Sequence, residues 1–174
     1  MDPVRTSPPD LCVRLATPAD RMPLYRMLEL YQYELSDIWD QDLDANGEFG
    51  YAIDRYWQDP QCSPYLILAG SKCAGFALVD KEVRIPGDDF WMDQFFVMKK
   101  YRRLGFGRAA AGMVFDLHPG KWQVGQMAKN HPAQAFWRKI IANFTSGHYQ
   151  EEQVTSGRWR GWVQRFRSEG NRHA

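Results

Sequence analysis

A basic turn that contains two glycines lies near the middle of the chain. Gly105 and Gly107 close a segment with five bases and no acid (Lys99, Lys100, Arg102, Arg103 and Arg108). Glycine lets the backbone turn tightly and approach a ligand without a Cβ in the way. A helical pattern starts at Phe106, and a helix start offers free N–H groups and a dipole that favours an anion. The turn therefore predicts a cradle for a diphosphate.

Two common nucleotide sites do not account for this turn. Residues 105–110 also match the dinucleotide pattern G-x-G-x-x-A, which requires an acid about 20 residues later for a ribose hydroxyl. The stretch 117–150 contains no acid. A kinase-type phosphate loop would end in Gly-Lys-Ser/Thr, and the turn lacks that ending. The diphosphate must belong to another ligand.

The charges of the chain fall into two opposite blocks. Residues 34–59 contain eight acids and one base, Arg55, whereas every charged residue of 99–108 is a base. Such a run can simply solvate a surface. Two opposite blocks in one small domain also suit a site for two substrates, with an anionic ligand at one end and a cationic ligand at the other.

The elements that position these residues follow from hydrophobic periodicity and turn signals. In chain order, the first part of the chain contains a strand at 11–15, a helix from about 17 that buries the face of Leu24 and Leu35, a short helix at 49–57, and strands at 65–69, 73–79 and 91–98. The remaining part contains a helix at 106–117, a strand at 122–127, a helix from 132, and strands at 149–154 and 159–166. This order predicts an α/β protein with one mixed sheet.

Composition indicates one soluble domain. The chain has 174 residues, of which 44% are hydrophobic and 25% charged, values typical of globular proteins. We expect a domain over 11–168, a flexible N-terminus over 1–10 and a flexible tail over 169–174. No apolar run approaches the ~20 residues of a membrane span. The three scattered cysteines predict neither disulfides nor a metal site, so we expect a cytoplasmic protein without a metal.

Several motifs resemble the GNAT family of N-acetyltransferases, in that family's order. Arg102-x-x-Gly105-x-Gly107 is similar to its acyl-CoA signature, and Asn130-x-x-Ala133-x-x-Phe136-Trp137 to its second motif. The strand from Asp93 to Met98 resembles the fourth strand of the family and is closest to spermidine/spermine acetyltransferases. Residues 14–20 resemble the usual first strand and helix start. Together these motifs cover about three quarters of the chain.

The resemblance implies a fold, a cosubstrate and a set of contacts. The fold would be a mostly antiparallel mixed sheet, flanked by helices, with strands 4 and 5 splayed apart to admit acetyl-CoA. The pantetheine arm would pair with the main chain of Phe95, Phe96 and Val97, and the pyrophosphate would bind the turn. Asn130, which can equally be a helix cap, would contact the arm. The implied cofactor-binding residues are Phe95, Phe96, Val97, Arg102, Arg103, Leu104, Gly105, Phe106, Gly107, Arg108, Asn130, Ala133 and Phe136.

The catalytic groups depart from the family's pattern. Trp137 stands where a tyrosine often acts as general acid, and an indole N–H does not usefully release a proton. Another group would protonate the departing thiolate, or the thiolate would leave beside the helix start, or the protein would be a poor catalyst. Asp93, at a position where spermine-type enzymes carry glutamate, is the candidate base.

The predicted reaction is direct acetyl transfer to a primary amine of a small cationic molecule. Tyr31, Glu34 and Asp37 would line the acceptor side. Three alternatives remain: a protein lysine or N-terminus as acceptor, a non-catalytic acyl-CoA sensor, and an interaction module without coenzyme. The bases and aromatics of residues 158–167 favour a strand with one solvent-exposed face over nucleic-acid binding. We expect no nucleic-acid or membrane partner, and a homodimer is a candidate assembly.

Overall fold

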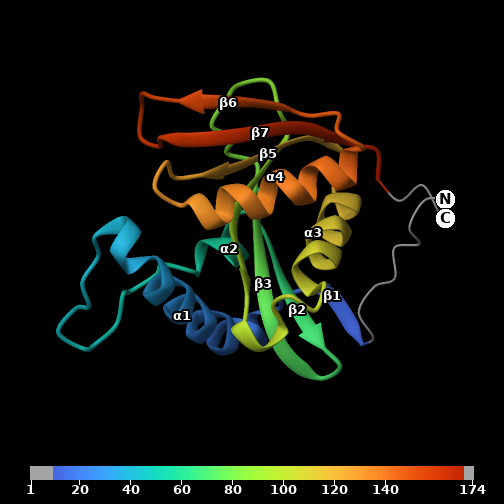
Figure 1. Ribbon diagram of the computed structural model, residues 1–174. Coiled ribbons are helices and arrows are strands. Elements are labelled where there is room, and N and C mark those ends of the chain that lie inside the picture. Colours follow the sequence, from blue (N-terminus) through green and yellow to red (C-terminus); the bar gives the residue numbers. More distant parts are fainter. Residues whose placement is uncertain (1–9, 171–174) are drawn as a thin grey trace.

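The computed structural model describes residues 10–170 and shows the predicted order of elements (Figure 1). They are β1 (Leu11–Leu15), α1 (Arg21–Trp39), α2 (Arg55–Gln58), β2 (Ser63–Ala69), β3 (Lys72–Asp80), β4 (Phe90–Val97), α3 (Phe106–Leu117), β5 (Gly120–Gln126), α4 (His131–Thr145), β6 (Gln150–Val154) and β7 (Gly161–Ser168), with 3₁₀ turns at Pro18–Asp20 and Lys99–Tyr101.

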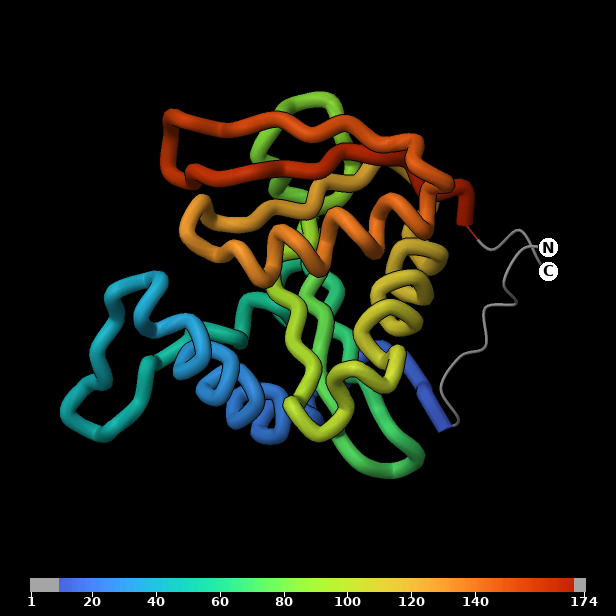
Figure 2. The backbone as a smooth tube through the Cα atoms, in the orientation of Figure 1, coloured from blue at the N-terminus to red at the C-terminus, as the bar shows by residue number. Residues whose placement is uncertain are grey.

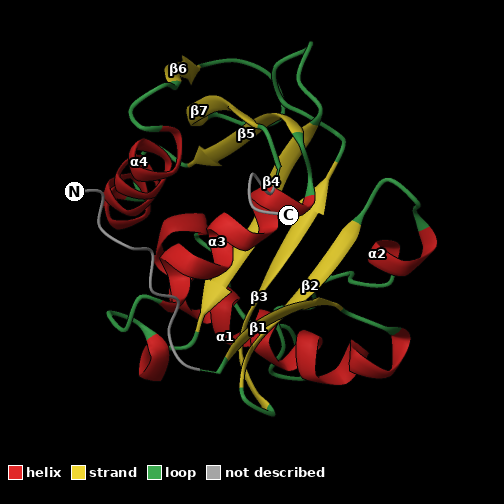
Figure 3. Cartoon of the chain, turned by 90° about the vertical axis from the view of Figure 1, so that its right-hand side faces the viewer, coloured by secondary structure: helices red, strands yellow, loops and turns green. Residues whose placement is uncertain are grey.

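The strands form a single seven-stranded sheet. Its order is β1-β2-β3-β4-β5-β7-β6, and every neighbouring pair is antiparallel except β4 with β5. Helices α3 and α4 lie on one face of this sheet and α2 lies on the other (Figure 3). The predicted α/β class, with a mixed and mostly antiparallel sheet flanked by helices, is confirmed.

Strands β4 and β5 pair over only a short length. The parallel register joins Phe90–Met92 to Trp122–Val124 and goes no further. On the other side of β4, Met92 is opposite Val79 while Gln94 is opposite Leu78, so Asp93 is an extra residue in a β-bulge. A bulge bends its strand and increases the local twist. The predicted splay of strands 4 and 5 therefore begins directly after Met92.

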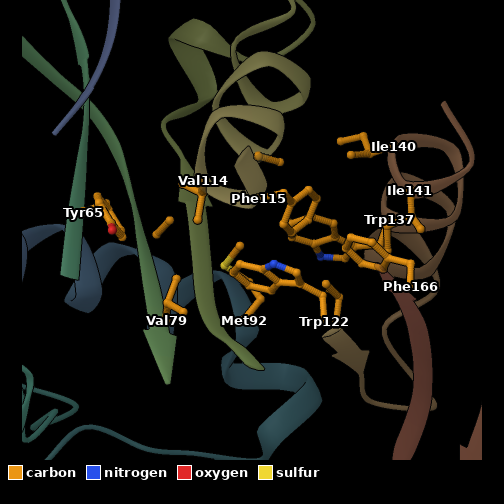
Figure 4. Close-up of a cluster of buried hydrophobic side chains, with 13 residues drawn as sticks. Tyr65, Val79, Met92, Val114, Phe115, Trp122, Trp137, Ile140, Ile141 and Phe166 are labelled. Atoms are coloured by element: carbon orange, nitrogen blue, oxygen red, sulfur yellow. The ribbon is translucent and has the colours of Figure 1, made fainter. Parts of the chain in front are cut away.

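Apolar side chains on both sheet faces hold the helices in place. Under α3 and α4, the ring of Phe115 lies 4.9 Å from that of Trp122 and 4.8 Å from that of Phe166. Figure 4 shows Trp137, Ile140 and Ile141 of α4 joining this cluster. On the opposite face α1 buries Leu24, Met27, Leu28 and Leu35, a helical spacing that the sequence predicted. Both faces of β4 are thus covered.

The predicted helix over 49–57 is wrong for most of its length. Only α2 is helical there, and residues 40–54 form a long loop that projects from the end of α1 (Figure 2). Gly47 and Gly50 have left-handed φ values of 76° and 75°. The Glu29 carboxylate accepts hydrogen bonds from the N–H groups of Phe49, at 2.8 Å, and Gly50, at 3.1 Å. The left-handed Gly50 interrupts helical geometry, and the Glu29 carboxylate holds this part of the loop against α1.

The ends that we expected to be flexible lie largely outside the described residues, which exclude 1–9 and 171–174. Of the expected tail, Glu169 and Gly170 are described. Gly170 is buried, and a Cβ added there would lie 2.8 Å from Pro119.

Candidate active site

A cavity of about 910 Å³ opens where β4 and β5 diverge. Most of the predicted site residues line it: Tyr31, Glu34, Asp93, Phe95, Phe96, Val97, Arg102, Arg103, Gly105, Gly107, Arg108, Asn130, Ala133 and Phe136. Three predicted residues are outside this lining. Asp37 lines a separate groove with Lys99, Leu104 is 61% exposed, and Phe106 is buried in the core.

The side chains of β4 divide the cavity into two sides. Phe95 and Val97 pack with residues of α3 or α4, and we call this the α4 side. Phe96 packs with α1, while Asp93 and Gln94 bond tyrosines of the loop and helix that follow α1; we call this the α1 side. Asp93 and Gln94 share one side because the bulge interrupts strand alternation.

The edge of β4 that faces the gap has unpaired main-chain groups. The N–H of Met98 donates to the carbonyl of Ala74 in β3 at 2.8 Å. Strand alternation then turns the main chain of Phe96 toward β3 and that of Phe95 and Val97 toward the gap. Of the three predicted partners for the pantetheine arm, Phe95 therefore presents its N–H and carbonyl to the gap and Val97 its N–H, whereas the Val97 carbonyl is bound by Arg102.

The turn before α3 has the conformation that an anion cradle requires. Arg103 and Gly105 have left-handed φ values of 63° and 82°. The first helical hydrogen bond runs from Ala109 to Gly105 at 3.0 Å. The preceding N–H groups, at residues 106–108, therefore have no carbonyl of their own helix to bind. At Gly107 an added Cβ would lie 3.1 Å from the ring of Phe136, a tight contact that the ring would have to relieve.

The arginines of this turn have different roles. Arg102 donates from Nε to the carbonyl of Val97 at 2.6 Å and from Nη2 to Glu34 at 2.6 Å. It thereby joins the turn to β4 and α1. Arg103 and Arg108 are exposed and make no ion pair with any residue of 10–170. Their charges are the ones available to a diphosphate.

Asn130 is a helix cap and also lines the cavity. Its Oδ1 accepts a hydrogen bond from the N–H of Ala133 at 3.2 Å. Trp137, at the usual tyrosine position, is 6% exposed and packs edge-on against Phe95 with ring centroids 5.0 Å apart. Its indole thus fills the wall beside the gap. The turn, the open edge of β4 and this wall together fit a ligand with a diphosphate and an extended arm.

On the α1 side, Asp93 belongs to a buried polar network. Its Oδ2 accepts hydrogen bonds from the phenol of Tyr56 and from Arg55 Nη2, the latter at 2.9 Å. Arg55 also binds Asp80 at 2.8 Å. Burial, together with the nearby charge of Asp93, raises the pKa of Tyr56, so its phenol remains a donor at neutral pH. The other carboxylate oxygen, Oδ1, is 3.9 Å from Arg84.

Sequence reasoning missed several residues of the α1 side. Trp91 and Trp159 meet edge-on, with ring centroids 5.2 Å apart, and Arg84 lies 4.8 Å from the centroid of the Trp91 ring. All three line the cavity. The sequence predicts a strand over 159–166 with one solvent-exposed face, but β7 begins later and Trp159 lies in the loop before it. The sequence feature that could have indicated this packing is Gly125, because a Cβ there would lie 2.3 Å from Trp91.

The acids of residues 34–59 mostly stabilise local structure. Asp54 pairs with Arg21 at 2.6 Å, and Glu48 accepts a hydrogen bond from Tyr25 at 2.9 Å. Asp44 accepts main-chain hydrogen bonds within its own loop. Of the acids in this block only Glu34 lines the cavity, and it is paired with Arg102.

Two other kinds of site are absent from the described part of the chain. Residues 10–170 contain no group of three or more His, Cys, Asp or Glu side chains that could hold a metal ion. They also contain no helix that is both long and apolar enough to cross a membrane.

Comparisons with known proteins agree with this geometry. An acetyltransferase from Thermus thermophilus has 14% identity and a TM-score of 0.67, with 94% of this chain and 100% of that chain covered. PaiA N-acetyltransferase from Thermoplasma acidophilum, determined with coenzyme A, has 10% identity and a TM-score of 0.62 over 91% and 99%. YncA from Salmonella typhimurium, determined with acetyl-CoA, has 14% identity and a TM-score of 0.59 over 95% and 97%.

These structural likenesses establish the fold. No curated protein sequence is significantly similar to this chain. The sequence model of the acetyltransferase (GNAT) family matches residues 24–141, which is more than half of the chain and includes both motifs and the splayed strands. The protein therefore belongs to the GNAT family of acetyltransferases.

Proposed function

We propose that this protein transfers an acetyl group from acetyl-CoA to a primary amine of a small cationic molecule, with both substrates bound together. One observation carries the proposal. The cavity at the β4–β5 splay has an anion cradle and an open strand edge on its α4 side, and the Asp93 carboxylate on its α1 side. Two substrates that approach from opposite faces would meet at the bulge.

Acetyl-CoA would supply an acyl group activated as a thioester. The residues of the turn would hold its diphosphate, through the N–H groups of residues 106–108 and the side chains of Arg103 and Arg108. A main-chain N–H on the gap edge of β4, at Phe95 or Val97, would donate to the thioester oxygen. Such a donor stabilises the charge that develops on that oxygen during attack.

Asp93 would remove a proton from the acceptor, directly or through water. A free amine with a pKa near 10 is only about 0.1% neutral at pH 7, so a nearby base is valuable. Oδ2 of Asp93 is occupied by Arg55 and Tyr56, so the amine would face Oδ1, whose ion-pair partner Arg84 is at the longer distance of 3.9 Å. As the C–N bond forms, the C–S bond breaks and sulfur leaves as a thiolate in the gap beside β4, at the opposite end of the pantetheine arm from the diphosphate.

The acceptor side suits an ammonium group with an apolar body. Tyr31 and Trp159 supply aromatic surface along the cavity, and aromatic faces attract cations; Trp91 already holds the Arg84 guanidinium over its ring. Glu34 adds a carboxylate at the same wall, and Asp37 lies in the neighbouring groove. These side chains support the cationic acceptor that we propose.

Thermal shift tests the proposal in two steps. Acetyl-CoA at 100 times its Kd should stabilise the protein by about 2.7 kcal/mol and raise Tm by about 5 to 10 °C. Pools of polyamines, amino acids, aminoglycosides and lysine peptides would follow, with coenzyme release as the readout. The absence of any shift with millimolar acetyl-CoA would refute the proposal. Turnover of lysine peptides alone would replace the small acceptor with a protein.

A further inference from the structure

One buried polar atom at the splay has no protein partner. Gln126, the last residue of β5, lines the cavity and is only 4% exposed. Its Nε2 donates to Oε1 of Gln164 at 2.7 Å. Its own Oε1 has no hydrogen-bond partner among residues 10–170. Buried polar atoms are nearly always paired, so this exception requires an explanation.

The orientation of this amide is fixed by a chain of hydrogen bonds. Arg138 of α4 binds both carboxylate oxygens of Glu151 at 2.8 Å. Oε2 of Glu151 also accepts a hydrogen bond from Nε2 of Gln164 at 2.6 Å. The hydrogen bonds from Arg138 lower the pKa of Glu151, so its carboxylate is ionised and can only accept.

This chain of hydrogen bonds determines which atom of each glutamine amide is the oxygen and which is the nitrogen, an assignment that is usually ambiguous. Gln164 must present its NH₂ group to Glu151, so its oxygen faces Gln126. Gln126 must then use its NH₂ group for Gln164, which leaves an oxygen as its free atom. The unpaired atom is therefore an acceptor, buried at the edge of the cavity, and only a donor can pair with it.

The side chain of Gln126 lies on the α4 side of the cavity. Along β5 it alternates with Gly125 and shares a face with Val124 and Trp122, which pack beneath α3 and α4. Trp137 belongs to the same cluster. Asp93, where the amine acceptor would bind, faces the α1 side. A ligand group beside Gln126 is therefore part of the coenzyme, and the acceptor is excluded.

We propose that Gln126 is a positioning residue whose Oε1 accepts a hydrogen bond from an amide N–H of the coenzyme's pantetheine arm. The arm contains two secondary amides, each with one N–H, whereas the thioester has none. The open edge of β4 would hold the arm from one strand and Gln126 from the other, so that the thioester is fixed between them. This inference rests on the proposed use of acetyl-CoA and is independent of the acceptor.

Binding measurements on Gln126→Met test the proposal. Methionine has a similar length and no strong acceptor, so the amide N–H of the arm would lose its partner. By titration calorimetry, the Kd of coenzyme A should rise about 5- to 50-fold. The Kd of 3′-phosphoadenosine 5′-diphosphate, which lacks the arm, should stay within about twofold of wild type. A merely structural role for Gln126 would weaken both ligands equally.

A second pair of variants tests the chain that orients the amide. Glu151→Gln removes the ion that fixes the direction of both glutamines, and the Kd of coenzyme A should rise about 2- to 5-fold. Glu152→Gln is the matched control. It changes the same charge on the next residue of β6, where the carboxylate accepts a hydrogen bond from Arg165 at 3.0 Å, and should leave this Kd unchanged.

Three outcomes would overturn the inference. One is wild-type affinity of Gln126→Met for coenzyme A, and another is an equal loss of both ligands. If Gln126→Met does not fold, equal affinity of Glu151→Gln and Glu152→Gln for coenzyme A decides against it. Failure of the wild-type protein to bind coenzyme A would instead remove the proposed function, and the inference with it.

Discussion

The two sides of the cavity are assembled in different ways. The α4 side uses two continuous segments, residues 102–108 and 130–137, and in our proposal it holds the coenzyme largely through main-chain groups. The α1 side gathers single side chains from distant parts of the chain. Tyr31 comes from α1, Arg84 from the loop before β4, Asp93 from the bulge and Trp159 from the loop before β7.

This difference separates the part of the site that the members of a family share from the part that sets the function of one member. A main-chain cradle tolerates many side chains and requires only glycine at close approaches, so its pattern is local. Side chains that converge from four segments depend on every loop between them, and loops vary more readily than the elements that they connect. We therefore expect substitutions on the α4 side to change coenzyme affinity, and substitutions on the α1 side to change turnover or acceptor KM.

The largest effect is expected at Asp93. Asp93→Asn keeps the size of the side chain but removes the base, so kcat should fall about 10²- to 10⁴-fold while the Kd of coenzyme A changes little. Steady-state kinetics between pH 6 and 9, together with calorimetry, would measure both. Wild-type turnover at pH 7 would assign proton removal to water or another group.

The next effect tests the α4 side. Gly107→Asp places a Cβ 3.1 Å from the ring of Phe136 and a negative charge beside the diphosphate cradle. The Kd of coenzyme A should rise about 100-fold or more, with the fold intact by circular dichroism.

Gly112→Ala is the matched control for Gly107→Asp. It lies in the same helix, and its Cβ would meet only Phe144 at 3.8 Å, an ordinary contact. This variant should bind coenzyme A as wild type does. A Gly107→Asp protein with unchanged affinity would move the coenzyme elsewhere and break the distinction between the two sides.

What could be predicted from the sequence follows the same division. The turn around Gly105 and the helix after it are local patterns, and the structure has them where we expected. The bulge at Asp93 depends on the pairing of β4 with β3, and the edge-on contact of Trp91 with Trp159 depends on a loop 68 residues away in sequence, so neither can be predicted from neighbouring residues alone. The likeness to spermidine/spermine acetyltransferases concerns the α1 side and stays a prediction.

The free arginines of the turn should have a moderate effect. Replacing both Arg103 and Arg108 with Ala removes exposed charges without breaking any ion pair of residues 10–170. The Kd of coenzyme A should rise about 3- to 10-fold at low salt, and its salt dependence should flatten. Arg167→Ala, which removes a charge on β7 paired with Glu169, should have no effect on coenzyme affinity. If the double variant and Arg167→Ala raise the Kd of coenzyme A equally, only the net charge of the protein affects coenzyme binding.

The smallest effect concerns the acidic block beside the α1 side. Our proposal of a cationic acceptor rests partly on these charges, but Glu34 cannot test steering alone because it also binds Arg102. Asp37 and Asp40 are exposed at the end of α1 and make no ion pair within residues 10–170, so Asp37→Asn with Asp40→Asn changes the local field and little else. Acceptor KM should rise about 2- to 3-fold at low salt and converge on wild type at physiological salt, where charges are screened over about 8 Å. The acetyl-CoA KM should stay constant. If the acceptor KM does not respond to both changes, or if the best acceptor is an anion, the acids serve only to solvate α1 and its loop. Selection of the amine would then depend on Asp93 and on the aromatic side chains of the α1 side.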